Sequence, residues 1–418
     1  MDPAPDVQLV LAYDKVLPLH SSVLARHSKR FASILTHEFA AVLCQRAKQQ
    51  GVTIRWRIEL RGVGVNGNSV GRLELDTMGQ LIQNPSYGTM IPLNENGKVP
   101  TKYFEYYTGI IGTFYGQELT LNDVGIQSAL EDAIGLIEVA EYLGSVAAVS
   151  KNIDLALIKQ GQVLFRSIAN NPLEWVDLAV RITSEIIFKE AVVHLVGRWN
   201  EFSSAQKSAL GKDVKRVCLK HADHLSRQRR ALELQMGVMY PGGITHPPNA
   251  APVKRDTYAA DIMMWMAVCL FRQWLMQQII QDKTFRAKDG GYALYKQLSE
   301  AGDKYLSRQT IAPFFRNFPM TKKGQNVFEN HLLELKEVVK GSVAKSGLLE
   351  SESALDTGKF KVPWLTCTVV DKADFPWVKK GPILGQKRVR DETHENDENE
   401  IDWDEDLEAN ADNKRVRE

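Results

Sequence analysis

Two stretches near the start of the chain alternate between apolar and polar residues, as half-buried strands do. Residues 7–19, VQLVLAYDKVLPL, predict two short strands around the turn Tyr13-Asp14-Lys15. Residues 53–75, TIRWRIELRGVGVNGNSVGRLEL, predict a β-hairpin whose turn is rich in glycine and asparagine. The pattern therefore places two pairs of short strands at the beginning of the chain.

The stretch PLHSSVLARHSKRF, which follows the first strands, concentrates histidine, serine and basic residues. Apolar residues recur at helical spacing from Val23 to Leu35, which predicts an amphipathic helix with Ser21 or Ser22 as its N-cap. The basic residues between these positions point away from the apolar stripe. We therefore interpret the stretch as scaffold with a solvated face, and neither as a catalytic cluster nor as a nucleic-acid patch.

Apolar residues at three- and four-residue spacing dominate the chain after residue 100, where they predict a series of helices. The clearest stretches are residues 103–115, 133–149, 173–199 and 258–280. A Gly- and Pro-rich break, GVMYPGGITHPPNAAP, separates two helical blocks. No repeat of fixed period occurs, so the pattern does not indicate a solenoid.

The last part of the chain, residues 379–418, has a different composition. It carries 8 Lys and Arg against 13 Asp and Glu, and twelve of these acidic residues lie between Asp391 and Asp412 without a basic one. A segment of this kind cannot bury enough apolar surface to offset its ordering entropy, so it predicts disorder.

Composition and charge narrow the functional classes. The net charge is +1, and residues 1–378 hold 44 basic against 38 acidic residues, or +6, so direct nucleic-acid binding is not expected. The beginning MDPAPDVQ shows no secretory signal, and the most apolar window, residues 262–271, is too short for a membrane span. The four scattered cysteines form no C-x-x-C pair and suit a reducing compartment. We expect a soluble intracellular protein without a membrane anchor.

The hexapeptide GVGVNG, residues 62–67, matches the glycine pattern of dinucleotide-binding folds. Those folds need a helix directly after the glycines, because the helix N-terminus holds the pyrophosphate. Here the alternating residues NSVGRLELD follow, which predict a strand. We therefore interpret GVGVNG as a hairpin turn and expect neither NAD nor ATP binding.

Cys218, His221 and His224 are the strongest metal candidates by spacing. On a helix the third of them lies about 240° from the first, so the three cannot converge on one ion. The surrounding segment KRVCLKHADHLSRQRR is either a solvated basic helix or a phosphate-contacting one. We interpret His194, which lies in another predicted helix, as a half-buried histidine. No nucleophile, zinc or phosphate-loop motif appears, so the sequence predicts a non-enzymatic protein with no cofactor and no metal.

Taken together, DVQLVLAYDKVLPLHSSVLARHSKRF resembles the beginning of a BTB/POZ domain. Two later segments are similar to helices of that family: KYFEYYTGIIGTFYGQEL and AIGLIEVAEYLGS, with Ala140 and Leu143 as its Ala-x-x-Leu core. The candidate signature and interface residues are Asp6, Leu19, His20, Leu24 and Phe31. Two features depart from the family pattern: the connection over residues 44–102 is longer, and Ser21 stands where repressor-type members carry a basic residue.

The resemblance implies a fold class and a division into domains. We expect an α/β BTB/POZ domain over residues 1–150 with an inserted β-hairpin region at about 44–102. An α-helical domain over residues 151–378 and a disordered basic-acidic-basic tail over residues 379–418 should follow. The BTB domain would pair with a second copy, so a homo-oligomer and protein partners are expected.

Three functional hypotheses stay open at the level of sequence. The first is a nuclear interaction scaffold linked to transcription or chromatin, and the second a substrate adaptor of a cullin-type ubiquitin ligase; the third, an enzyme, would need a pocket that the sequence does not reveal. Basic residues of the tail are candidates for nuclear import: Lys379, Lys380, Lys387, Arg388 and Arg390. Ile401, Trp403 and Leu407, set among acidic residues, are candidates for docking a partner, and the alternative is a tail that only solubilises.

Overall fold

The computed structural model describes most of the chain before residue 379. The described residues are 4–12, 15–43, 45–61, 72–75, 101–121, 125–240, 255–284 and 286–378. The described residues up to Val378 belong to one compact unit, and the chain divides after Val378.

A small sheet lies at the beginning of the first unit, with strand order β2-β1-β3-β4. Strand β1 (Val7–Ala12) pairs antiparallel with β2 (Lys15–Leu19) and parallel with β3 (Trp56–Arg61). Strand β3 pairs antiparallel with β4 (Arg72–Leu75), from Ile58 opposite Leu75 to Arg61 opposite Arg72. Both predicted strand pairs are therefore confirmed, whereas the turn GVGVNG lies outside the described residues.

Four short helices connect β2 with β3: α1 (Ser21–His27), α2 (Lys29–Ile34), the 3₁₀ helix η1 (His37–Phe39) and α3 (Gln45–Gln49). The single helix predicted over Val23 to Leu35 is wrong, because the chain becomes extended at Ser28 with φ −134° and ψ 121°. The Ser28 hydroxyl accepts a hydrogen bond from the Phe31 amide at 3.1 Å and so caps α2. Neither Ser21 nor Ser22 is a cap, since His20 precedes α1 without a side-chain cap bond.

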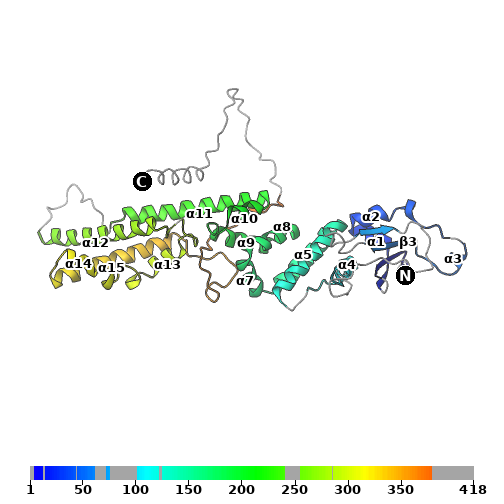
Figure 1. Cartoon of the computed structure of the whole chain (residues 1–418), viewed down its shortest axis with the longest axis horizontal. Coiled ribbons are helices and arrows are strands. Elements are labelled where there is room, and N and C mark those ends of the chain that lie inside the picture. The colour runs from blue at the N-terminus through cyan, green and yellow to red at the C-terminus, as the bar shows by residue number, and fades with distance from the viewer. Residues whose placement is uncertain are drawn as a thin grey trace, which may run out of the picture. The chain divides into compact units, whose positions relative to one another are not determined.

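The remainder of the described chain is helical, apart from its last segment. The longer helices are α4 (Thr101–Phe114), α5 (Ile126–Leu143), α6 (Val146–Ile158), α7 (Gln162–Asn170), α8 (Pro172–Ile182), α9 (Glu185–Gly197), α11 (Lys212–Val238), α12 (Arg255–Ile280), α13 (Tyr292–Glu300), α14 (Arg308–Asn317) and α15 (Lys322–Lys345). Three short ones complete the order: α10 (Ser204–Ala209) and the 3₁₀ helices η2 (Gly302–Lys304) and η3 (Lys372–Asp374). Figure 1 shows α11, α12 and α15 as the long helices of the later part.

The predicted fold class is wrong. Among the described residues, strands are confined to one small sheet before residue 76, and helices make up the body of the chain. One cluster of buried apolar residues extends from Val7 in β1 to Phe375 near the end of the unit. Helix α6 crosses residue 150, where the first domain was expected to end, and the predicted division into domains stays a prediction.

A segment without strands, residues 348–378, returns from the end of α15 across α9 and α11; we call it the strap (Figure 1). Several of its apolar side chains join the main core, among them Leu348, Leu365 and Phe375. The strap has no hydrophobic period of its own, so its position depends on specific contacts with the helices.

Candidate functional site

The residues predicted as a BTB signature do come together, as part of the scaffold. The Asp6 carboxylate accepts hydrogen bonds from the Ser21 amide at 2.6 Å and from its hydroxyl at 2.5 Å. The His20 amide donates to the Tyr115 hydroxyl at 2.9 Å. Leu24 and Phe31 are fully buried, and Leu19 is 6% exposed. The interpretation of this stretch as scaffold therefore agrees with its burial.

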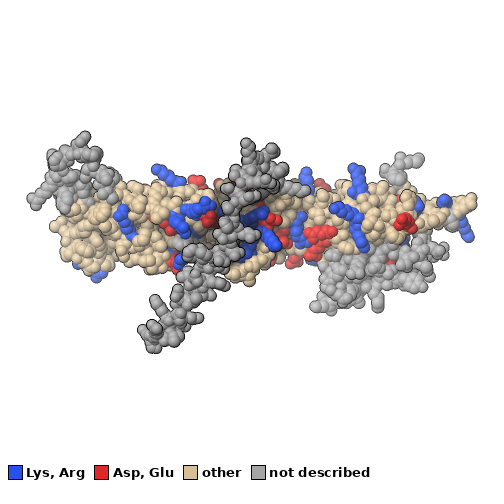
Figure 2. Space-filling model, turned by 90° about the horizontal axis from the view of Figure 1, so that it is seen from above, with Lys and Arg blue, Asp and Glu red and all other residues tan. Residues whose placement is uncertain are grey.

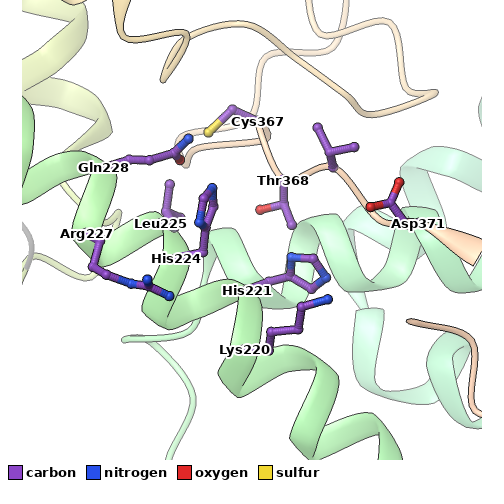
Figure 3. A pocket seen from close by; sticks show the side chains of 10 residues that line it. Lys220, His221, His224, Leu225, Arg227, Gln228, Cys367, Thr368 and Asp371 are labelled. Atoms are coloured by element: carbon purple, nitrogen blue, oxygen red, sulfur yellow. The ribbon is translucent and has the colours of Figure 1, made fainter. Parts of the chain in front are cut away.

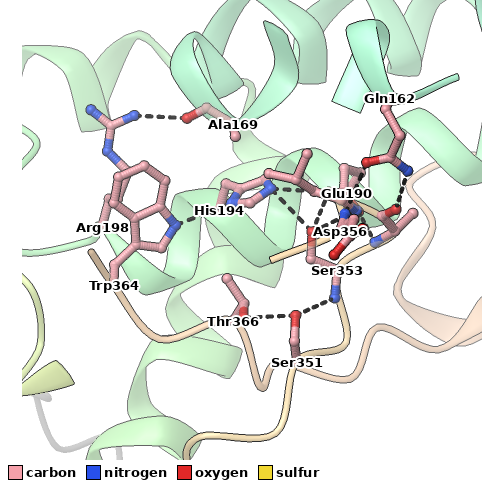
Figure 4. A network of polar contacts seen from close by, with 12 residues as sticks. Gln162, Ala169, Glu190, His194, Arg198, Ser351, Ser353, Asp356, Trp364 and Thr366 are labelled. Carbon is pink, nitrogen blue, oxygen red and sulfur yellow. Dashed lines mark hydrogen bonds and ion pairs between the residues drawn. The ribbon is translucent and has the colours of Figure 1, made fainter. Parts of the chain in front are cut away.

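Three side chains at the junction of α9 and the strap look at first like a catalytic triad. His194 and Glu190 lie one turn apart on α9, with the His194 Nε2 at 3.0 Å from the Glu190 Oε1. Ser353 of the strap places its Oγ at 3.4 Å from the same Nε2 and donates to the Glu190 carboxylate (Figure 4). Both His194 and Glu190 are nearly or fully buried.

The hydrogen bonds fix the tautomer of His194, and this excludes the triad chemistry. The Trp364 indole Nε1 lies 3.1 Å from the His194 Nδ1 and can only donate, so Nδ1 is an acceptor. The proton of the neutral ring is therefore on Nε2 and is donated to Glu190. A general base would need a free nitrogen facing the Ser353 hydroxyl, and His194 offers none.

The Glu190 carboxylate holds the strap through several donors. It accepts from the Ala354 amide at 2.7 Å and from the Leu355 amide at 3.3 Å, besides Ser353 and His194. Burial raises the pKa of Glu190, but the hydrogen bonds from His194, Ser353 and Ala354 outweigh burial and leave the pKa below its ordinary value. The group is therefore an ionised, buried clamp.

The next turn of α9 packs against the strap at close range. A Cβ on Gly197 would collide with the backbone carbonyl of Leu365, so only glycine allows this approach. The Arg198 guanidinium lies 4.8 Å from the centre of the Trp364 ring, and its Nη1 donates to the Ala169 carbonyl at 3.0 Å (Figure 4). These contacts make α9 and the strap one structural layer.

Helix α11 holds the end of the strap. The buried Asp374 carboxylate accepts from the Lys220 ammonium at 2.5 Å and from the His221 Nε2 at 2.9 Å. Burial raises the pKa of Asp374, whereas the hydrogen bonds from Lys220 and His221 lower it, and the net pKa is below its ordinary value. Behind this anchor, Phe375 stacks on Trp377 with ring centres 5.1 Å apart.

An open groove remains between α11 and residues 367–371 of the strap, with a cavity of about 310 Å³ (Figure 3). Its floor includes the buried Leu225, and Val369 at its edge is 56% exposed. The polar lining consists mostly of hydrogen-bond donors: Lys220, His224, Arg227, Gln228 and Thr368, with Asp371 as the acidic member. The groove can therefore accept an acidic side chain next to an apolar one.

The exposed side of α11 is only moderately positive. Its exposed cations are Lys212, Arg216, Lys220, Arg227 and Arg230. Three of the five are paired with carboxylates of Asp213, Asp374 and Asp223. On the face drawn in Figure 2, the Lys and Arg side chains of the described residues lie with Asp and Glu side chains among them and form no continuous basic surface there.

The groove is lined by the Cys367 thiol and by the imidazoles of His221 and His224. Burial raises the pKa of the Cys367 thiol to about 11, so this cysteine is protonated at neutral pH and a poor nucleophile. Cys218, His221 and His224 do not converge: Cys218 is buried, with its pKa raised to about 12, His221 binds Asp374, and His224 faces the groove. Among the residues that the structure describes, no group of three or more His, Cys, Asp or Glu could hold a metal ion.

The tail residues predicted to act in import and docking all lie outside the described residues. The contacts of the strap were not predicted, although Glu190 and His194 at i and i+4 on one helix were a visible signal. In the described part of the chain, no helix has the length and apolar character that a membrane crossing requires.

Residues 241–345 match the family model of the fungal FF domain. The matched range contains α12, α13, η2, α14 and α15 of the structure. No curated protein matches the chain. The predicted BTB/POZ resemblance is therefore wrong: the family model that matches is an FF domain in the later helices, and no BTB model matches the first 150 residues.

Proposed function

We propose that this protein is a non-enzymatic scaffold that binds other proteins through its helical region. The observation that carries the proposal is the match of residues 241–345 to the FF domain. FF domains are typically protein-interaction modules. The BTB domain has no part in this proposal.

The helices of the matched range are held by aromatic packing that suits a rigid binding module. Phe328 of α15 is fully buried and stacks on Phe314 of α14, with ring centres 5.0 Å apart. The Lys336 ammonium of α15 donates to the carbonyls of Gly302 at 2.7 Å and Leu306 at 3.1 Å, which fixes the turn before α14. A surface on such a module keeps its shape when a partner binds.

The groove between α11 and the strap supports the same function. It lies outside the matched range and offers hydrogen-bond donors beside exposed apolar surface, which are the elements of a peptide-binding site. Catalysis is not supported by the groove thiol, which is protonated, or by His194 of α9, whose two ring nitrogens are both engaged. We assign to the groove a partner segment in which an acidic residue adjoins an apolar one.

The proposed place of action is the nucleus, in regulation linked to transcription or chromatin. The support is the sequence of the tail, where Lys387, Arg388 and Arg390 form a basic cluster and Lys379 and Lys380 a basic pair. Ile401, Trp403 and Leu407 add a second partner-docking candidate. The role of a cullin adaptor depended on the BTB resemblance, and no contact of the described residues favours it.

The location is tested with the full chain fused to a fluorescent protein. We expect nuclear fluorescence for the wild type and loss of nuclear accumulation for Lys387/Arg388→Ala. The matched control is Lys414/Arg415→Ala in the last basic cluster. Equal nuclear signal in the wild type and in Lys387/Arg388→Ala would contradict the assigned import signal, and a purely cytoplasmic wild type would contradict the nuclear role.

The scaffold function is tested by co-purification and mass spectrometry of the tagged full chain. The groove variant combines Arg227→Glu with Val369→Asp, both at exposed positions, 70% for the Arg227 side chain and 56% for Val369. The control combines Lys151→Glu with Leu155→Asp, which are both exposed on α6 and lie outside residues 241–345. We expect the groove variant to lose a subset of partners that the control and Trp403→Ala retain. A partner list no richer than that of an unrelated tagged protein would contradict the scaffold.

A further inference from the structure

Helix α12 exposes a long apolar stripe to solvent. Ile262, Trp265, Met276 and Ile280 are 39%, 45%, 42% and 80% exposed. Cys269 and Gln273, which complete the stripe, are also exposed. At 100° per residue all six positions fall within an arc of about 80°, so they form one continuous line along the helix.

The stripe is unusual because it carries no charge. Between Ile262 and Ile280, Arg272 is the only Lys, Arg, Asp or Glu residue in the sequence. Its Nη2 donates to the Met239 carbonyl at 3.2 Å, and its guanidinium lies 5.8 Å from the centre of the Trp265 ring. A helix that is apolar on all sides is normally buried on all sides, and α12 is not.

Apolar surface continues from the stripe onto the end of α11. Tyr240 lies beside Trp265, with ring centres 5.8 Å apart, and Val238 two residues earlier is 72% exposed. The exposed parts of the four large α12 side chains correspond to roughly 400 Å², if a fully exposed side chain of this size has about 200 Å². With Cys269, Gln273 and Val238 the face reaches roughly 600 Å² per chain, at the lower limit of specific interfaces.

The spacing of the stripe is symmetric about its middle. A two-fold axis there would place Ile262 opposite Ile280 of a second copy and Cys269 opposite Gln273. Trp265 would then lie beside Met276 of the second copy, where a thioether and an aromatic ring attract each other. A two-fold interface between identical chains needs this kind of self-complementarity. Binding of an unrelated partner helix would not require it.

We infer that this face of α12 is a self-association surface, and that two chains pair through antiparallel α12 helices. The inference goes beyond the proposed function and does not depend on it, because a monomeric scaffold could still bind partners. The small area predicts a weak dimer, with a dissociation constant of roughly 10–100 µM.

The test measures the mass of the full chain by sedimentation equilibrium from about 1 to about 200 µM, a range that brackets a weak interface. We expect a concentration-dependent shift from monomer to dimer. Ile280→Glu and Met276→Glu should each weaken the dimer at least tenfold, while Leu155→Glu, a similarly exposed position on α6, should not. Circular dichroism and thermal melting verify that each variant is folded.

Cross-linking locates the interface. In the proposed pair the two Cys269 residues are offset along the helix by about 6 Å, within reach of a short bis-maleimide. We expect a cross-linked dimer in the wild type that is absent in Cys269→Ser and reduced in Ile280→Glu, which keeps the cysteine. A monomeric mass at the highest concentration would overturn the inference, as would a dimer that both glutamate variants leave intact. Binding of the monomer to phosphatidylcholine vesicles through this face would replace the second copy with a membrane and overturn it too.

Discussion

Replacing Glu190 with glutamine should release the strap from α9. The carboxylate receives four hydrogen bonds, from the His194 ring, the Ser353 hydroxyl and the amides of Ala354 and Leu355. Glutamine keeps the shape of the side chain but puts an NH₂ group where one oxygen was. The Ala354 amide binds the carboxylate oxygen that accepts no other hydrogen bond, so we expect the NH₂ group of glutamine at that position. The NH₂ group would then face the Ala354 N–H, and neither group could accept a hydrogen bond from the other.

The size of the effect follows from these contacts. An orphaned buried N–H costs about 1–3 kcal/mol, and the other three bonds lose their charge assistance. We expect the strap to be destabilised by about 2–4 kcal/mol, which corresponds to a rise of roughly 30- to 900-fold in its opening constant. The loss is local because the helices keep their own core contacts.

Hydrogen exchange of the full chain measures this opening directly. Two protected amides of the strap serve as reporters and do not bind Glu190: Glu352, bonded to the Thr366 carbonyl at 2.8 Å, and Phe360, bonded to the Asp356 carbonyl at 2.8 Å. Glu337→Gln on α15, where the side chain is 64% exposed, is the matched control and should leave exchange unchanged. Less than about a threefold acceleration in Glu190→Gln would mean that the carboxylate does not hold the strap.

Three further predictions concern the strap and helix α2. Gly197→Ala should destabilise the strap by about 1–3 kcal/mol, because its Cβ meets the Leu365 carbonyl, whereas Gly341→Ala, whose Cβ meets open space, should be neutral or slightly stabilising in thermal melts. Ser28→Ala removes the cap of α2 and the donor to the Leu143 carbonyl at 2.7 Å, so it should cost about 1–2 kcal/mol, against about zero for Ser33→Ala, in denaturant titrations. The pKa values of Glu190 and Asp374 are both lowered in the folded chain, so both groups stabilise the strap above their ordinary pKa values near 4 and lose this contribution as the pH falls below about 4. Tryptophan fluorescence of the strap should therefore change in acid, and Asp374→Asn should already show at neutral pH part of the change that the wild type shows in acid; an acid transition identical in both would contradict this.

Sequence patterns predicted the strands well because the residues that alternate also bury one face. Leu9, Leu11, Ile58 and Leu60 are fully buried, and both predicted strand pairs form. Helical regions were also found, but their breaks were not. The stretch 173–199 is divided at Thr183, which adopts φ 55°, and the stretch 133–149 at Gly144 with φ 63°. The spacing of apolar residues alone does not reveal that one residue with a positive φ ends a helix and turns the chain.

The family resemblance failed because it depended on short local motifs. A hairpin followed by an amphipathic helix and an alanine-rich helix satisfies elementary burial requirements in many folds. The FF match lies in helices whose apolar period was recognised at residues 258–280 but not assigned to a family. The position of the strap could not be predicted from the sequence, because its apolar residues do not recur at a regular spacing. Its contacts also join residues such as Glu190 and Ala354 that are 164 positions apart.

The most direct test of the central claim, that this chain is a protein-binding scaffold, is calorimetry with the purified full chain and the partner most enriched in co-purification. We predict saturable binding that Arg227→Glu/Val369→Asp weakens at least about tenfold, while Lys151→Glu/Leu155→Asp binds like the wild type. Equal affinity in all three chains would contradict the assignment of the groove as a partner-binding site. No saturable binding of any enriched protein to the wild-type chain would contradict the scaffold itself.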